Sequence, residues 1–139
     1  MKQGLMRATI AARFAAACVA VFAVPAGAQE LDGKALFLKN CAACHQPTGK
    51  GIPGAFPALA GNKFVQGKGS EVAAVLLKGR GGMPDFSASL NDRDIATVLS
   101  YVRSSWGNQA EGLAEPEVGA LRDALGVQAY SNATMANKH

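Results

Sequence analysis

Hydrophobic and polar positions repeat with a helical period most clearly in residues 91–105 and on to Trp106. Apolar side chains recur there at the i, i+3, i+4, i+7 and i+11 positions of one helix face, and they are Ile95, Val98, Leu99, Val102 and Trp106. Asn91 is the expected N-cap, because its side chain can accept a hydrogen bond from a free backbone N–H of the first turn. No stretch alternates residue by residue as a half-buried strand would, so the pattern predicts an all-α fold.

Two shorter helices are expected before this one. Residues 32–41 (DGKALFLKNC) start at Asp32, which is a favourable N-cap. Residues 70–78 (SEVAAVLLK) start at Ser70, the expected N-cap of the second helix, and Gly79 ends it. The ordered part of the chain is therefore predicted to consist mainly of three helices.

Long loops rich in glycine and proline, residues 46–69 and 80–90, separate the three helices. Loops of this length are unusual in a compact domain unless they have a binding role. Three short helices also offer little apolar surface from which to build a hydrophobic core of their own. A large apolar cofactor between the loops would fill the middle of such a domain.

The N-terminus has the pattern of a secretory signal peptide. Residues 2–13 contain three basic and no acidic residues, residues 14–24 form an apolar run of 11, and residues 26–28 read Ala-Gly-Ala. The apolar run is too short to span a bilayer comfortably. We expect residues 1–28 to direct export to the periplasm and to be cleaved after Ala28; an uncleaved N-terminal anchor is the alternative.

The C-terminal residues 108–139 are expected to form a tail beyond a domain at residues 29–107. Within the tail, residues 116–125 predict a short helix with Pro116 at its first position. Two readings stay open at this stage: this helix docks on the domain or on a partner, or the tail is a weakly ordered end.

Composition and charge exclude some classes of protein. Of the 139 residues, 49% are apolar and 17% charged, which excludes a wholly disordered chain. Without the leader, 11 basic and 10 acidic residues remain, so the balance gives no sign of nucleic-acid binding. Residues 29–80 carry seven basic and three acidic residues, and residues 81–139 carry four and seven. This uneven distribution of charge suits electrostatic steering towards a charged partner. Solvated charged faces with no steering role would give the same distribution.

The remaining cysteines, Cys41 and Cys44, form a C-x-x-C-H motif with His45, which is the attachment signature of c-type haem. This spacing lets both sulfurs reach one edge of the porphyrin, and the adjacent imidazole then binds the iron. A thioredoxin-like pair would need a strand before the motif. A zinc site would need four ligands, and His139 at the terminus is the only further histidine.

With this motif, residues 31–106 resemble the class I cytochrome c family. Gly33, Phe37 and Cys41 have the spacing with which the N-terminal helix of that family crosses its C-terminal helix. The resemblance implies a small cytochrome c fold, in which three main helices and long loops wrap around one covalently bound haem c.

Two loops add to the resemblance. Residues 56–61 (FPALAG) are similar to the family loop whose proline carbonyl accepts the N–H of the proximal histidine, which assigns Pro57 to orient His45. Residues 81–84 (GGMP) are similar to the loop that supplies the distal sulfur, which assigns Met83 as the second axial ligand. Leu59 and Phe86 would then line the haem. The implied haem-binding residues are Cys41, Cys44, His45, Pro57, Leu59, Met83 and Phe86, with His45 and Met83 on the iron.

The groups that contact the haem propionates are left open by the sequence. The candidates are Lys63, Lys78, Arg80, Tyr101 and Trp106. The family often has an aromatic propionate partner between the two loops, whereas residues 62–82 offer only Phe64.

The resemblance implies an electron carrier rather than an enzyme, because His45 and Met83 would leave the iron no open position. Residues 51–62 and 99–108 further resemble cytochrome subunits of membrane-bound alcohol and aldehyde dehydrogenases. The expected partners are redox proteins, namely a dehydrogenase, an oxidase or a respiratory complex, which can be membrane-associated, and no nucleic acid is expected. The protein would be a free carrier or a small subunit.

A second hypothesis is a haem protein whose Met83 is labile and which acts as a peroxidase or binds small gases. Only the paired glycines Gly81 and Gly82, as a hinge, favour it. A non-redox interaction module is a third reading.

Overall fold

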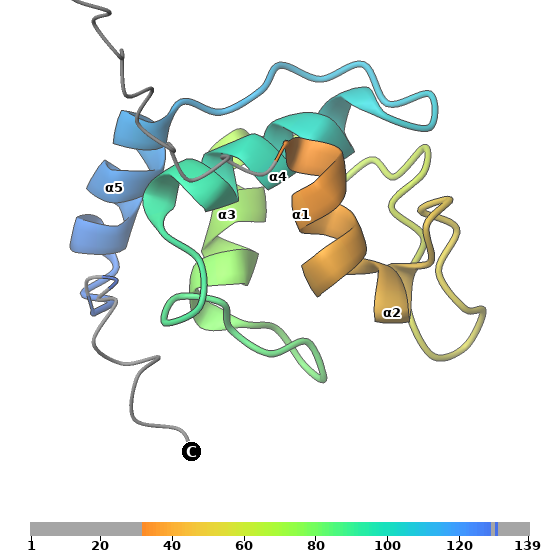
Figure 1. Ribbon diagram of the computed structural model, residues 1–139, viewed down its shortest axis with the longest axis horizontal. Coiled ribbons are helices and arrows are strands. Elements are labelled where there is room, and N and C mark those ends of the chain that lie inside the picture. The colour runs from red at the N-terminus through yellow and green to blue at the C-terminus, as the bar shows by residue number, and fades with distance from the viewer. Residues whose placement is uncertain (1–31, 129, 131–139) are drawn as a thin grey trace, which may run out of the picture.

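The computed structural model describes residues 32–128 and residue 130, and this part of the chain is helical without strands (Figure 1). The helices are α1 (Gly33–Asn40), α2 (Ala42–His45), α3 (Gly69–Lys78), α4 (Asp92–Ser104) and α5 (Glu115–Ala124). The predicted all-α class is confirmed. The predicted signal peptide at residues 1–28 lies outside the described residues. Among the described residues, none of the helices has the length and apolar character needed to cross a membrane.

The crossing of α1 and α4 is the centre of the fold. At Gly33 an added Cβ would lie 2.6 Å from Tyr101 Cβ and 2.7 Å from the Thr97 carbonyl oxygen, so only glycine allows the two helices to approach this closely. One turn later, Phe37 is fully buried, and its ring packs 4.9 Å from the ring of Trp106. The buried apolar side chains that form one core cluster with this crossing come from α1, α3, α4, α5 and the loops, and they are Leu36, Phe37, Val65, Val72, Ala73, Leu76, Leu77, Leu90, Ile95, Ala96, Val98, Leu99, Val102 and Val118.

Side-chain caps begin two of the helices where the sequence predicts them. Asp32 Oδ1 accepts a hydrogen bond from Ala35 N at 2.7 Å, and Asn91 Oδ1 accepts one from Asp94 N at 2.8 Å. Each cap satisfies a backbone donor that the first turn of a helix leaves without a partner.

The prediction of Ser70 as the N-cap of α3 is wrong. The helix begins one residue earlier, at Gly69, and Lys68 occupies the N-cap position with an extended backbone and no side-chain cap. The Lys68 carbonyl already accepts hydrogen bonds from Glu71 N at 3.1 Å and Val72 N at 3.3 Å. Ser70 is thereby drawn inside the first turn, where its hydroxyl is not in the capping position.

The C-terminal helix α5 packs against α3 and α4 (Figure 1). Its Val118 is fully buried. The chain reaches α5 along α4, where Ala110 N donates to the Arg103 carbonyl at 3.0 Å and Leu113 N donates to Ser100 Oγ at 3.0 Å. The sequence left open whether this segment docks or is a weakly ordered end. In the structure, α5 docks on the domain.

We predict that Gly33→Ala lowers the free energy of unfolding by about 1–3 kcal/mol, because the new methyl group forces α1 away from α4. Chemical denaturation of the haem-loaded protein measures this. The matched control is Gly69→Ala, where the nearest atom to the added Cβ is the flexible end of Leu113 at 3.2 Å. Equal losses of stability in the two variants would contradict a close helix crossing at Gly33.

Candidate functional site

The C-x-x-C-H motif occupies a break between two helices. α1 ends at Asn40, and Cys41 leaves the helical conformation with φ −123° and ψ −31°. The Cys41 carbonyl accepts hydrogen bonds from Cys44 N at 3.2 Å and His45 N at 3.0 Å, which start the short helix α2. Both cysteines are half-buried and His45 is buried. The sequence did not predict α2, because four residues are too few to show a period.

His45 is oriented by the loop that follows. Its Nδ1 donates a hydrogen bond to the Pro57 carbonyl oxygen at 2.9 Å. A carbonyl only accepts, so Nδ1 carries the proton and Nε2 is the ring nitrogen left to bind a metal. A histidine held in this way has a fixed ring and is a stronger donor to a metal.

The loop between His45 and Pro57 is closed by backbone hydrogen bonds at glycines. Gly51 N donates to the His45 carbonyl at 2.9 Å, and the Gly49 carbonyl accepts from Leu59 N at 2.7 Å. Gly49 has a φ of +67°, and a Cβ there would lie 2.5 Å from the Trp106 ring. Glycine is therefore required for this loop to return Pro57 to the histidine.

Met83 lies in a tight turn. Arg80 N donates to the Met83 carbonyl and Met83 N donates to the Arg80 carbonyl, both at 3.1 Å. The turn passes through Gly81, whose φ is +60°. Three residues after Met83, Phe86 N donates to the Leu76 carbonyl at 2.7 Å, which attaches the loop to α3. The paired glycines therefore close a hydrogen-bonded turn.

A cavity of about 300 Å³ brings the sequence-predicted residues together. It is lined by Cys41, Cys44, His45, Pro57, Leu59, Met83 and Phe86. Apolar side chains from three helices and one loop complete the wall, among them Phe37, Phe64, Val72, Val75, Leu76, Leu99 and Val102. The lining fits a flat apolar ring system, because it joins two thiols on one turn, an oriented imidazole and a thioether within an apolar wall.

Few polar side chains reach this cavity. Of the five candidates for propionate contacts, only Arg80 is part of the lining, where its guanidinium lies 4.5 Å above the centre of the Phe64 ring. The rings of Tyr101 and Trp106 pack instead against Phe37. Asn62, which the sequence analysis did not single out, also lines the cavity.

Asn108 is a second residue that the sequence analysis missed. It is 3% exposed. Its Oδ1 accepts from Gly61 N at 2.9 Å, and its Nδ2 donates to the carbonyls of Leu59 at 3.0 Å and Val102 at 2.9 Å. This one side chain joins the end of α4 to the loop that carries Leu59 along the cavity wall. Its position just after Gly107 is the only signal in the sequence, and it does not reveal these partners.

The alternative roles of the two cysteines receive no support from the site. Burial, together with the neighbouring Cys44, raises the pKa of the Cys41 thiol to about 11. A thioredoxin-like cysteine needs the opposite shift, because the thiolate is the attacking form. In residues 32–128 and 130, no three histidine, cysteine, aspartate or glutamate side chains are grouped so that they could hold a metal ion, as a zinc site would require.

The chain is similar over much of its length to several known proteins. Residues 28–102 match the family model described as cytochrome c oxidase, cbb3-type, subunit III. The chain is 35% identical over 107 residues to the cytochrome c subunit of a quinone alcohol dehydrogenase from Gluconacetobacter polyoxogenes, which covers 67% of this chain and 23% of that protein. The chain thus spans less than a quarter of the length of that relative.

Smaller proteins match over more of their length. Cytochrome c-552 of Thermus thermophilus is 34% identical over 95 residues, covering 57% of this chain and 71% of that protein. Cytochrome c6 of Microcystis aeruginosa is 40% identical over 74 residues, covering 51% of this chain and 90% of that protein.

We predict that Asn108→Ala lowers the free energy of unfolding by about 2 kcal/mol, because it leaves the buried Val102 carbonyl and the part-buried backbone groups of residues 59 and 61 without these partners. Thermal or chemical unfolding of the haem-loaded protein measures the loss. Gln109→Ala removes a neighbouring exposed side chain and is the control. If both variants unfold like the unmodified protein, Asn108 does not hold this wall.

Proposed function

Because the chain belongs to the cytochrome c family of cbb3-type oxidase subunit III, it is an electron carrier with covalently bound haem c, and we propose that His45 and Met83 are its axial ligands. The observation that carries the proposal is the shared cavity: both side chains line it, together with Cys41 and Cys44. When bound, the haem supplies a one-electron couple between ferric and ferrous iron. The residues of the chain determine how that couple is held and tuned.

The proximal side is assigned to His45. The hydrogen bond from Nδ1 to the Pro57 carbonyl, at 2.9 Å, supports Nε2 as the iron ligand. We assign Cys41 and Cys44 to the two thioether bonds, because both closely precede this histidine, Cys41 as the N-cap of α2 and Cys44 within it. Leu59 and Phe86 are assigned to the wall, where they exclude water.

The distal side is assigned to Met83. A thioether is a soft, neutral donor that favours the ferrous form and so raises the reduction potential. The hydrogen bonds between Met83 and Arg80, both 3.1 Å long, support a loop that keeps one shape during electron transfer. They also weigh against a labile Met83, on which a peroxidase or gas-binding role would depend.

The partners are proposed from the relatives and from the charges. Cytochrome subunits of quinone alcohol dehydrogenase, gluconate 2-dehydrogenase and fructose dehydrogenase are among the related proteins. We propose a periplasmic carrier, free or bound to a dehydrogenase, that passes electrons to a respiratory complex or oxidase. The exposed Lys34 and Lys39 on α1, and Lys50 beyond the motif, would face an acidic partner surface. The leader-like residues 1–28 support export.

We predict that Met83→Ala lowers the reduction potential on the order of 0.1 V, a modest part of the range of about 0.8 V that axial ligation spans. The ferric variant should lose the near-infrared methionine–iron absorption band. The ferrous variant should bind carbon monoxide at neutral pH, whereas the unmodified protein should not.

Two results would count against this assignment. An unchanged potential with the band still present in Met83→Ala would remove Met83 from the iron. Rapid carbon monoxide binding by the unmodified ferrous protein would favour the labile-methionine hypothesis instead.

A further inference from the structure

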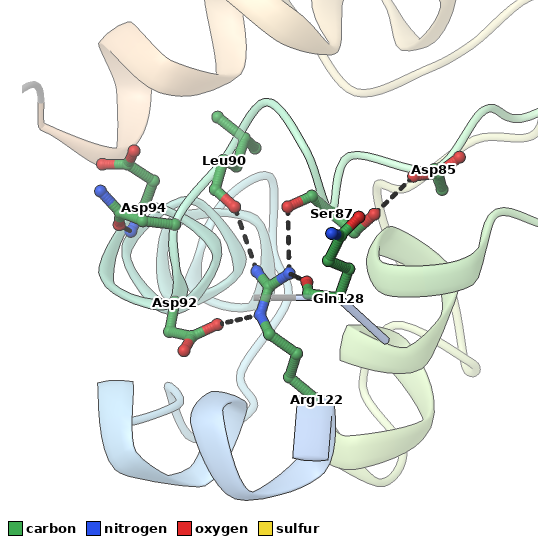
Figure 2. A network of polar contacts seen from close by, with 8 residues as sticks. Asp85, Ser87, Leu90, Asp92, Asp94, Arg122 and Gln128 are labelled. Atoms are coloured by element: carbon green, nitrogen blue, oxygen red, sulfur yellow. Dashed lines mark hydrogen bonds and ion pairs between the residues drawn. The ribbon is translucent and has the colours of Figure 1, made fainter. Parts of the chain in front are cut away.

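Arg122 on α5 is a buried arginine at the centre of a polar network (Figure 2). It is only 3% exposed. Its Nε donates to Asp92 Oδ1 at 2.7 Å. Its Nη1 and Nη2 donate to the carbonyls of Ser87 at 3.0 Å, Gln128 at 3.0 Å and Leu90 at 3.1 Å. A buried guanidinium requires hydrogen-bond acceptors of this kind. The contacts therefore hold α5 firmly against the segments that provide the acceptors.

Most of these acceptors belong to one short segment, residues 87–92, which joins the Met83 loop to α4. Ser87 follows Met83 by four residues. Between them, Phe86 lines the cavity and is attached to α3 through the Leu76 carbonyl. The chain that leaves Met83 is therefore fixed first to α3 and directly afterwards to α5.

Local contacts connect the two attachment points to each other. Leu90 N donates to the Phe86 carbonyl at 2.9 Å, and Ser87 Oγ donates to Asp85 Oδ1 at 2.7 Å. Pro84, next to Met83, restricts the backbone further. A displacement of the segment at Ser87 is thus passed to Phe86 and Asp85 and from there to Met83.

We propose that Arg122 is a positioning residue for Met83: by holding residues 87–90 on α5 it keeps the Met83 loop closed and the sulfur on the iron against competing ligands. The inference rests on the distal role of Met83 under the proposed function. The loop exists in an equilibrium between closed and open forms. For a ligand that binds only the open form, the apparent affinity equals the intrinsic affinity multiplied by the fraction of open molecules. Arg122 keeps that fraction small.

The experiment titrates the ferric haem-loaded protein with imidazole and follows the loss of the methionine–iron band. In Arg122→Gln the neutral side chain cannot reach all of the acceptors, so the loop opens more often. The apparent dissociation constant for imidazole is expected to fall about tenfold relative to the unmodified protein, in proportion to the rise in the open fraction.

Arg103→Gln is the matched control. Arg103 is 5% exposed and donates to the carbonyls of Val65 at 2.6 Å, Gly67 at 3.0 Å and Glu111 at 2.7 Å. These acceptors lie outside the Met83 loop. Val65 lines another part of the cavity wall, so the control removes a comparably buried arginine that holds a different cavity loop. It should therefore change imidazole affinity far less than Arg122→Gln does. Equal shifts in both variants at equal loss of thermal stability, or no shift in Arg122→Gln, would overturn the inference.

Arg122→Lys is the milder variant and decides the question if Arg122→Gln yields no folded protein. It keeps a charge beside Asp92 but replaces the planar fork with one ammonium group. Its imidazole affinity should lie between those of the unmodified protein and the glutamine variant. An affinity equal to that of the unmodified protein, with Arg122→Gln also unchanged or not folded, would contradict the inference.

Amide hydrogen exchange separates this inference from the ligand assignment. The amides of Phe86 and Leu90, both hydrogen-bonded in the segment, should exchange faster in the Arg122 variants than in Arg103→Gln. If the unmodified protein lacks the methionine–iron band, the assignment of Met83 is wrong, whereas the exchange comparison still tests whether Arg122 holds the loop.

Discussion

The hydrogen bond between His45 and the Pro57 carbonyl is the contact on which the rest of the site depends. It joins the two parts of the chain that must meet, namely the turn bearing the cysteines and the loop that returns along the cavity. It also fixes which ring nitrogen carries the proton. The geometry is possible because α1, crossing α4 at Gly33, holds the cysteine turn in place, and because Gly49 lets the loop turn back beneath Trp106.

The loops around the cavity are held by buried polar side chains from the C-terminal half of the chain. Asn108 binds the backbone at residues 59 and 61, Arg103 binds it at residues 65 and 67, and Arg122 binds it at residues 87 and 90. Loops that form no helix or sheet leave backbone groups without backbone partners. Where these groups are removed from water, side chains must supply the hydrogen bonds. In this small domain, α4, α5 and the chain between them supply donors to the carbonyls of these loops and, in Asn108 Oδ1, an acceptor for Gly61 N.

Much of the fold could be predicted from local signals. The apolar period of α4, the cap Asp32 and the cap Asn91 are each encoded within a short stretch of sequence, and the cysteine motif has a fixed spacing. The supposed cap at Ser70 failed because the Lys68 carbonyl already starts the helix. The roles of Arg103 and Arg122 could not be derived, because a charged residue on a helix normally indicates a solvent-facing side. The available hint was their helical register: Arg103 follows Leu99 by four residues, and Arg122 follows Val118 by four, so each shares a buried face.

Covalent attachment of one haem within this cavity is the central claim, and the most direct measurement is the mass and colour of the purified, unfolded protein. The chain should be produced in a host that attaches haem to C-x-x-C-H motifs and then treated with acidified acetone. The account predicts that the red colour stays with the polypeptide and that its mass is that of the chain plus one haem. A natively folded protein that is colourless, or one whose haem is extracted to leave the bare chain, would contradict it.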